Sequence, residues 1–228
     1  MTLVIGHRGA SHDFAENTVD AFVGALEQGA DWVELDVRRT VDGVLVVHHD
    51  PVLADGRVIA ELQHRAIPSS VPTLHDAFAA MGHMGVNVEI KNSPGEPGYD
   101  PSGSIAHQTV EVIEIVSDGR DVLVSCFDLT TLDIVRAAAP DLATGYLVLS
   151  TEEPADAVGL AVSSGHGAVN PWDPCVSSES VARAHAAGVA VNVWTVDDPD
   201  RIRQLAEWGV DAVITNRPAL AREALRRG

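Results

Sequence analysis

The stretch Val86-Asn87-Val88-Glu89-Ile90-Lys91 has the pattern of a buried β-strand that ends in charged side chains. Lys91 is the only lysine of the chain, and the other 14 of its 15 basic residues are arginines. Three further apolar runs end in polar groups in the same way, at 4–9, 32–38 and 46–50. This recurrence predicts that the ends of several strands carry one functional site.

Short β-branched runs alternate with amphipathic, alanine-rich stretches, which is the pattern of βα units around a parallel sheet. The predicted strands are 3–6, 31–38, 86–90, 122–125, 143–148, 167–170, 189–194 and 211–215. The predicted helices are 17–28, 74–83, 104–118, 129–138, 152–164, 177–187, 198–208 and 218–226. Eight of each predicts one α/β domain over residues 1–228, a closed (β/α)₈ barrel, in which the loops after the strands build the active site.

Several helix boundaries have chemistry of their own. Asn17 and Thr73 are predicted N-caps, and Gly29 and Gly188 stand where a helix must stop. The dipeptide Asp198-Pro199 opens a helix with proline at its first position.

The segment after the second predicted strand departs from the βα rhythm. Asp42-Gly43 lies between two apolar runs, which is a strong signal for a β-hairpin. If these two residues form the turn, Val41 faces Val44, and the ladder continues until His49 lies opposite Asp36. A register slip of one residue would undo this pairing.

Composition limits the partners and the compartment. The formal net charge of −18 argues against nucleic acid and against stable association with an anionic membrane, because both favour basic surfaces. The two cysteines, Cys126 and Cys175, are far apart in sequence and are interpreted as free thiols. The start of the sequence lacks a signal-peptide pattern, and no apolar run is long enough to span a bilayer. We therefore expect a cytoplasmic protein.

Glu34 and Asp36 are two residues apart, so in a strand both side chains emerge on one face. Inside a barrel, two unpaired carboxylates would be costly to bury, and they need a cation. Glu89 on the neighbouring strand can supply a third carboxylate, and an all-oxygen site suits Mg²⁺ or Ca²⁺. The alternative is an ion-pair network with Arg8, Arg38 and Lys91.

His7 ends the first strand, at the rim where this fold places catalytic groups. Histidine is the usual acid/base side chain, so His7 and His49 could share the two proton transfers of a hydrolysis. His48 ranks second, because it should face away from His49. Arg8 can form two parallel hydrogen bonds to phosphate oxygens, and Lys91 can bind a third oxygen. These groups suit metal-assisted phosphate chemistry.

The same residues, in this order, resemble the motifs of the glycerophosphodiester phosphodiesterase family. The matching segments are His-Arg-Gly at 7–9, Glu-Asn-Thr at 16–18, Glu-Leu-Asp-Val at 34–37, His-Asp-Pro at 49–51, Pro-Thr-Leu at 72–74, Glu-Ile-Lys at 89–91 and Val-Trp-Thr at 193–195. Residues 214–218 are similar to the family's closing strand. The resemblance therefore runs from the first strand to the last.

The resemblance implies a (β/α)₈ TIM barrel of the phospholipase C-like (PLC-like) phosphodiesterase type, to which the Asp42-Gly43 signal adds a short β-hairpin arm after strand 2. It implies hydrolysis of glycerophosphodiesters to glycerol 3-phosphate and an alcohol, a reaction of glycerol and lipid metabolism that uses one divalent cation, Mg²⁺ or Ca²⁺. Carried over by position, the metal ligands are Glu34, Asp36 and Glu89, the acid and base are His7 and His49, and the phosphate ligands are Arg8 and Lys91. Trp194 would pack against substrate carbons, although core packing is nearly as good an interpretation.

One departure from the family bears on the substrate. Only about twenty residues separate His49-Asp50-Pro51 from Pro72-Thr73-Leu74, so the inserted subdomain beside the mouth is short. The alternatives are a lysophospholipid- or other lipid-cleaving phosphodiesterase of the same barrel type and a non-catalytic barrel that binds a phosphodiester. The sequence leaves open the leaving alcohol, the identity of the cation and the oligomeric state.

Overall fold

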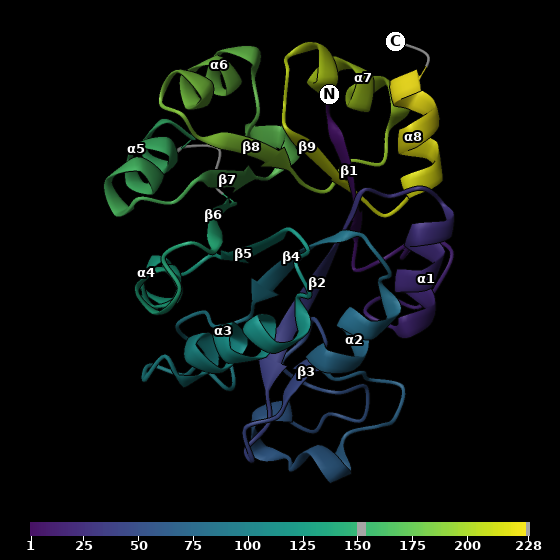
Figure 1. Cartoon of the computed structure of the whole chain (residues 1–228), viewed down its shortest axis with the longest axis vertical. Helices are drawn as coiled ribbons and strands as arrows, with labels where there is room; N and C mark the ends of the chain where they lie inside the picture. Colours follow the sequence, from purple (N-terminus) through teal and green to yellow (C-terminus); the bar gives the residue numbers. More distant parts are fainter. Residues whose placement is uncertain (150–153, 227–228) are drawn as a thin grey trace.

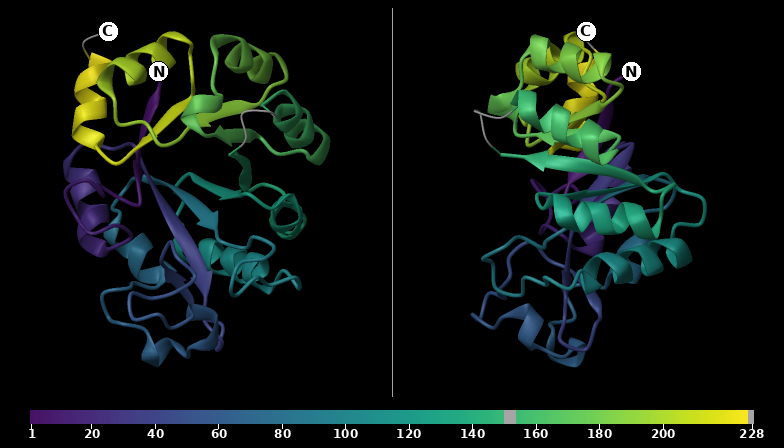
Figure 2. Two further views of the ribbon diagram at one scale, coloured as in Figure 1. Left: turned by 180° about the vertical axis from the view of Figure 1, so that it is seen from behind. Right: turned by 90° about the vertical axis from the view of Figure 1, so that its left-hand side faces the viewer.

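The computed structural model describes residues 1–149 and 154–226, and within them the strands form a closed ring (Figure 1). Eight parallel strands follow the order β1-β9-β8-β7-β6-β5-β4-β2, and a pairing between β1 and β2 closes the barrel. Helices lie outside the strands around the ring, as the two further views also show (Figure 2). The predicted (β/α)₈ barrel is confirmed.

The barrel strands are β1 (Leu3–His7), β2 (Trp32–Arg39), β4 (Gly85–Ile90), β5 (Val122–Cys126), β6 (Ala143–Val148), β7 (Ala168–Pro171), β8 (Ala190–Val193) and β9 (Ala212–Thr215). The helices are α1 (Val19–Glu27), α2 (Leu74–Ala80), α3 (Ser104–Val116), α4 (Leu129–Ala138), α5 (Pro154–Ser164), α6 (Ser178–Ala186), α7 (Pro199–Glu207) and α8 (Pro218–Arg226). Residues 152–153, the first two of one predicted helix, lie outside the described residues.

The helix boundaries follow from local chemistry, with one exception. Thr73 caps α2 in a capping box with Asp76, and Asp198 caps α7 with Pro199 at its first position. The prediction for Asn17 was wrong. Thr18 is the residue whose side chain accepts the N–H of Ala21 at the start of α1, and Asn17 serves another purpose described below.

The short strand β3 (Leu45–Val47) pairs antiparallel with β2, and the observed register corrects the predicted one. Arg38 lies opposite Val46, which is one residue away from the register that a two-residue turn would give. The turn has three residues instead, because Thr40 pairs with Val44 and Gly43 takes a positive φ of 84°. His48, rather than His49, therefore lies opposite Asp36, and its main-chain N–H donates to the main-chain oxygen of Asp36.

An arm follows β3 and extends beyond the barrel at the bottom of Figure 1. It contains two single turns of 3₁₀-helix, η1 (Ile59–Glu61) and η2 (His64–Ala66), and packs its own small core of Val46, Leu53, Ile59 and Ile67. It lies next to the loop between β4 and α3, because Gly98 of that loop closely approaches Ala60.

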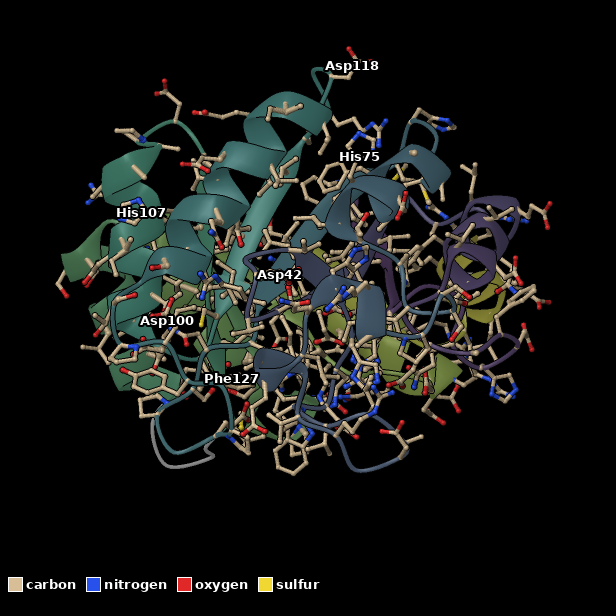
Figure 3. The ribbon with its side chains drawn as sticks, turned by 90° about the horizontal axis from the view of Figure 1, so that it is seen from below. Asp42, His75, Asp100, His107, Asp118 and Phe127 are labelled. Carbon is tan, nitrogen blue, oxygen red and sulfur yellow. The ribbon has the colours of Figure 1, made fainter. Side chains whose placement is uncertain are left out.

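The main apolar core lies between the strands and the surrounding helices, with Phe22, Leu35, Phe78 and Leu132 among its fully buried side chains. The carboxyl ends of the strands open at one end of the barrel. Figure 3 shows this direction for β5. Asp118, before the amino end of the strand, lies at the top of the view, and Phe127, after its carboxyl end, lies in the lower part. Within residues 1–149 and 154–226, every helix is too short or too polar to cross a lipid bilayer.

Candidate active site

Strand register brings the predicted functional residues to one layer at the carboxyl end of the barrel. His7, the last residue of β1, pairs with Glu34 of β2, and Asp36 of β2 pairs with Glu89 of β4. One cavity is lined by seven of the eight residues predicted for the site: His7, Arg8, Glu34, His49, Glu89, Lys91 and Trp194. Asp36, the eighth, is fully buried directly beside them and contacts Arg8 and Lys91.

Glu34, Asp36 and Glu89 form a compact buried cluster. Each can offer an oxygen such that these atoms lie within 4.8 Å of one another. Glu34 Oε2 accepts the main-chain N–H of Arg8 at 2.9 Å, whereas the buried Glu34 Oε1 has no hydrogen-bond partner among the described residues. Asp36 Oδ1 also lacks a hydrogen bond among the described residues, although it lies 3.0 Å from Lys91 Nζ. A set of three oxygen donors with such unsatisfied oxygens fits a hard divalent cation.

Two cations contact this cluster, as the ion-pair alternative requires. Arg8 Nε lies 3.2 Å from Asp36 Oδ2, and Lys91 Nζ lies 3.0 Å from Asp36 Oδ1 and also contacts Glu89. Arg38, the third cation of that alternative, instead forms its ion pair with Glu96. Arg8 and Lys91 therefore leave one carboxylate of the cluster, Glu34, without an ion-pair partner among the described side chains.

The pKa values of the carboxyl groups follow from this uneven pairing. Burial, and then the charges of Asp36 and Glu89, raise the pKa of Glu34 well above its ordinary value. Burial also opposes ionisation of Asp36, but the charges of Lys91 and Arg8 outweigh it and lower the pKa of Asp36 to about 2. Burial also raises the pKa of Glu89, in spite of the opposing charge of Lys91. The electrostatic need for another cation therefore lies at Glu34 and, to a lesser degree, at Glu89.

Asn17 orients the buried Asp36 from outside the barrel strands. Its Nδ2 donates to Asp36 Oδ2 at 2.7 Å, and its Oδ1 accepts the main-chain N–H of Asp36 at 3.3 Å. Asn17 is buried and has a positive φ of 57°, a conformation that asparagine tolerates better than most residues. The sequence pattern assigned this side chain to a helix cap.

The ring of His7 is oriented by a network that joins the ends of the chain. Asp197 Oδ2 accepts the side-chain N–H of Asn216 at 2.6 Å, and a carboxylate can only accept, so Asn216 Oδ1 must point the other way. That oxygen lies 2.7 Å from His7 Nδ1 and therefore accepts its N–H. The neutral ring of His7 then carries its lone pair on Nε2.

The ring of His49 is held in the same manner but closer to solvent. Its Nδ1 lies 2.8 Å from Oδ1 of Asp50, the next residue. Asp50 thereby fixes Nδ1 as the hydrogen-bond donor of the His49 ring. The Nε2 of His49 is then free for proton transfer, as is the Nε2 of His7. His48 turns elsewhere, with its Nδ1 2.9 Å from the main-chain oxygen of Asp50, and it does not line the cavity.

Both site histidines favour the neutral form. Burial is the main cause that lowers the pKa of His7, and the nearby charge of Arg8 lowers it further. Burial also lowers the pKa of His49, assisted by Lys91 and Arg8 and opposed by Asp36. Each neutral ring can accept a proton at Nε2 while Nδ1 stays hydrogen-bonded.

One side of the cavity is apolar. Trp194 follows β8 and meets the ring of Phe127 edge-on, with centroids 5.8 Å apart, while its Nε1 donates to the main-chain oxygen of Asn170 at 2.7 Å. Leu147, Leu149 and Ile214 complete this side. Both cysteines are buried free thiols, and burial raises the pKa of Cys126 to about 12. Neither thiol lines the cavity.

Comparison with known proteins places this site in a family. The model of the glycerophosphoryl diester phosphodiesterase family matches residues 7–220. The chain belongs to this family. It is 31% identical to a glycerophosphodiester phosphodiesterase of Caldanaerobacter subterraneus subsp. tengcongensis over 100% of this chain and 99% of that protein. The match makes this chain a phosphodiesterase of the family.

Solved structures show the same fold over the whole chain. An Oleispira antarctica phosphodiesterase, solved in complex with the product sn-glycerol-3-phosphate, has a TM-score of 0.90 at 26% identity, covering 99% of this chain and 97% of that one. A glycerophosphodiester phosphodiesterase of Thermotoga maritima has a TM-score of 0.82 at 26% identity and covers 98% of each chain.

Proposed function

We propose that this chain, as a single barrel domain, hydrolyses glycerophosphodiesters to sn-glycerol 3-phosphate and an alcohol. The observation that carries the proposal is the cavity lined by two oriented histidines, two cations, Glu34 and Glu89, with the third carboxylate of the cluster, Asp36, buried directly beside it. The names of the relatives, and the product bound to the Oleispira antarctica structure, support a substrate of this kind.

Glu34, Asp36 and Glu89 would hold one divalent cation, Mg²⁺ or Ca²⁺. Their burial, their oxygen donors and the unpartnered Glu34 Oε1 fit such an ion. When bound, the ion supplies Lewis-acid stabilisation of negative charge on the phosphoryl group.

Charge balance supports phosphate binding by Arg8 and Lys91. The three carboxylates exceed these two side chains by one negative charge. Within this set, a divalent cation reverses the balance to one positive charge, which matches the single negative charge of a phosphodiester. Glu16 also pairs with Arg8, at 3.0 Å, but its side chain is 51% exposed and lies outside the buried set. Arg8 and Lys91 line the cavity, so they can then contact phosphate oxygens as well as the carboxylates.

His7 and His49 would move the two protons of the reaction. One neutral ring accepts a proton at Nε2 from the attacking hydroxyl group, and the other, protonated ring donates from Nε2 to the leaving alcohol. Asn216 and Asp50 hold the two Nδ1 atoms in their donor role throughout. Trp194 and Phe127 would contact the carbon portion of the substrate and exclude water from it.

The direct test is release of glycerol 3-phosphate from glycerophosphoethanolamine and glycerophosphocholine, with EDTA-treated protein and with Mg²⁺ or Ca²⁺ added back. Release that depends on the added ion supports the proposal and ranks both alcohols and ions. No release from folded, metal-loaded protein would contradict it.

Cleavage of lysophospholipids is a second candidate function. The apolar side of the cavity favours it, because Leu149 is 59% exposed and continues the apolar lining outward. An acyl chain could lie along such a surface. A lysophospholipid tested beside glycerophosphocholine, at equal concentration, distinguishes the two candidates by the ratio of their kcat/KM values.

The activity is expected to persist at mildly acidic pH. Burial is the main cause that lowers the pKa values of both His7 and His49 from the ordinary value of histidine, so a neutral ring able to accept a proton is available at mildly acidic pH. We expect kcat/KM to rise with pH along an acid limb whose midpoint lies below the ordinary pKa of histidine, and to fall again at higher pH as the proton-donating ring loses its proton. A pH profile with its acid limb centred above the ordinary pKa of histidine would contradict the assignment.

Replacing Asn17 with glycine is expected to weaken metal binding by about 10- to 100-fold, because Asp36 loses the amide that orients it. Glycine tolerates the positive φ at this position, so the backbone is preserved. Calorimetric titration with Mg²⁺ or Ca²⁺ measures the effect, and Asp20→Asn, an exposed change in the same segment, is the control. Equal affinity of Asn17→Gly and the wild type would contradict the role of Asn17.

A further inference from the structure

The side chain of Arg38 connects the main chain of His49 to a separate loop. Its Nε donates to the main-chain oxygen of His49 at 2.7 Å. Its Nη2 lies 3.2 Å from Oε2 of Glu96, in the loop between β4 and α3. Only 8% of the Arg38 side chain is exposed, so its guanidinium is largely desolvated, whereas 42% of the Glu96 side chain is exposed and its carboxylate keeps contact with water. A hydrogen bond from a charged, largely buried donor such as Arg38 is strong.

His49 needs such an anchor because β3 ends two residues before it, at Val47. The preceding residue, His48, is fixed to β2 through its main-chain N–H, which donates to the main-chain oxygen of Asp36 at 2.9 Å. The partner of the His49 ring, Asp50, has a side chain that is 66% exposed. The bond from Arg38 is therefore a partly buried contact that ties the main chain of His49 to β2.

The loop that carries Glu96 is itself ordered. Asn92 is buried, and its side chain both donates to the main-chain oxygen of Asp100 and accepts the Asp100 N–H, at 3.1 and 2.7 Å. Glu96 thus lies on a closed loop that begins just after Lys91 of the site. Its carboxylate compensates the buried charge of Arg38 and fixes the direction of the guanidinium.

We propose that Arg38 is a positioning residue for His49, and that Glu96 holds Arg38 in the required orientation. The proposal rests on the proposed acid/base role of His49. Arg38 does not line the cavity, so it acts through the main chain of His49 rather than on the substrate. The nitrogen Nε2 of His49 must be held to a fraction of an ångström for proton transfer, and Arg38 supplies part of that constraint.

We expect Arg38→Met to lower kcat by about 10- to 100-fold with a smaller change in KM, because a misplaced catalytic group loses rate more than binding. Arg38→Lys should retain more activity, since an ammonium group can bind one of the two acceptors but lacks the rigid fork. Arg39→Met is the matched control. Arg39 is the next residue of the same strand, and its Nε donates at 2.7 Å to Gln108 of α3, away from the cavity.

A double-mutant cycle separates positioning from stability. Arg38→Met and Arg39→Met each remove a hydrogen-bonded arginine, and both are expected to lower the melting temperature, but only Arg38→Met should lower kcat. In the His49→Ala background, Arg38→Met should change the residual kcat less than twofold, because the group that it positions is absent. A merely structural Arg38 would reduce the activity of both backgrounds by the same factor, and that result would overturn the proposal.

The outcomes also distinguish this proposal from the proposed function. Full turnover by His49→Ala would refute the acid/base role of His49 and with it the role of Arg38. Loss of turnover by His49→Ala together with normal kcat in Arg38→Met would overturn the positioning role alone. If Arg38→Met does not fold, the same cycle with Arg38→Lys decides, because the lysine keeps the buried positive charge beside Glu96.

Discussion

Replacement of His49 or of His7 with alanine is expected to lower turnover by about 10²–10⁴-fold while leaving the fold intact. Each ring lines the cavity and has its Nδ1 fixed by an acceptor, so each presents Nε2 for proton transfer. Alanine removes that nitrogen. Steady-state release of glycerol 3-phosphate measures the loss, and circular dichroism with thermal unfolding checks the fold.

His48→Ala is the matched control for these variants. His48 is the neighbour of His49 but does not line the cavity, so we expect its variant to keep nearly full turnover. Near-normal turnover by folded His7→Ala or His49→Ala would remove that histidine from the mechanism. A loss in His48→Ala as large as that in His49→Ala would show that the loop, rather than the ring of His49, determines activity.

The barrel could be predicted because its signals are local. Each strand is a short β-branched run, and helix boundaries such as Thr73 and Asp198 carry capping side chains whose effect depends on the adjacent residues. The grouping of Glu34, Asp36 and Glu89 followed from the two-residue period of strands and from the common edge of parallel strands. The structure places this group as that reasoning requires.

The register of the β2–β3 pair could not be predicted from the Asp42-Gly43 signal alone. Two- and three-residue turns both place glycine at a positive φ, and they differ by one residue in register. His49 nevertheless reaches the cavity, because the chain leaves the ladder after Val47 and irregular backbone turns its side chain inward.

The residues that orient the site were missed because their partners are distant in sequence. Asn216 reaches His7 across 209 positions, and the contact exists only because β9 pairs with β1 to close the barrel. Asn17 contacts Asp36 across 19 positions through a backbone conformation that the capping pattern does not indicate. Asp197 after β8 and Asn216 after β9 are polar residues in loops, and polar residues of this kind are common in turns. Their presence in the sequence therefore gave only a weak indication that they orient a catalytic group.

The absence of a nucleic-acid partner, the absence of a stable membrane association and a cytoplasmic location stay predictions that rest on charge and composition. The site itself supports a small anionic ligand, because its cations lie within a cavity among carboxylates rather than on an open surface.

Glu34→Gln is expected to abolish the metal-dependent part of the activity and to leave the metal-free protein at least as stable as the wild type. Glu34 is buried, has an unpartnered Oε1 and has a raised pKa, so its carboxylate destabilises the metal-free fold. Glutamine removes that charge and also removes a ligand. Thermal unfolding with and without Mg²⁺ or Ca²⁺, beside a turnover assay, measures both effects.

The response to metal distinguishes a ligand from a structural carboxylate at this position. A ligand present at 100 times its Kd stabilises the wild type by about 2.7 kcal/mol, and this gain should disappear in Glu34→Gln. Asp36→Asn should also lose metal binding, but it should lower the stability of the metal-free protein, because Lys91 and Arg8 lose their shared partner. Glu27→Gln, an exposed change on α1, should alter neither property. Unchanged metal affinity of Glu34→Gln and Asp36→Asn would contradict the metal site and favour the alternative interpretation, a purely structural ion-pair network.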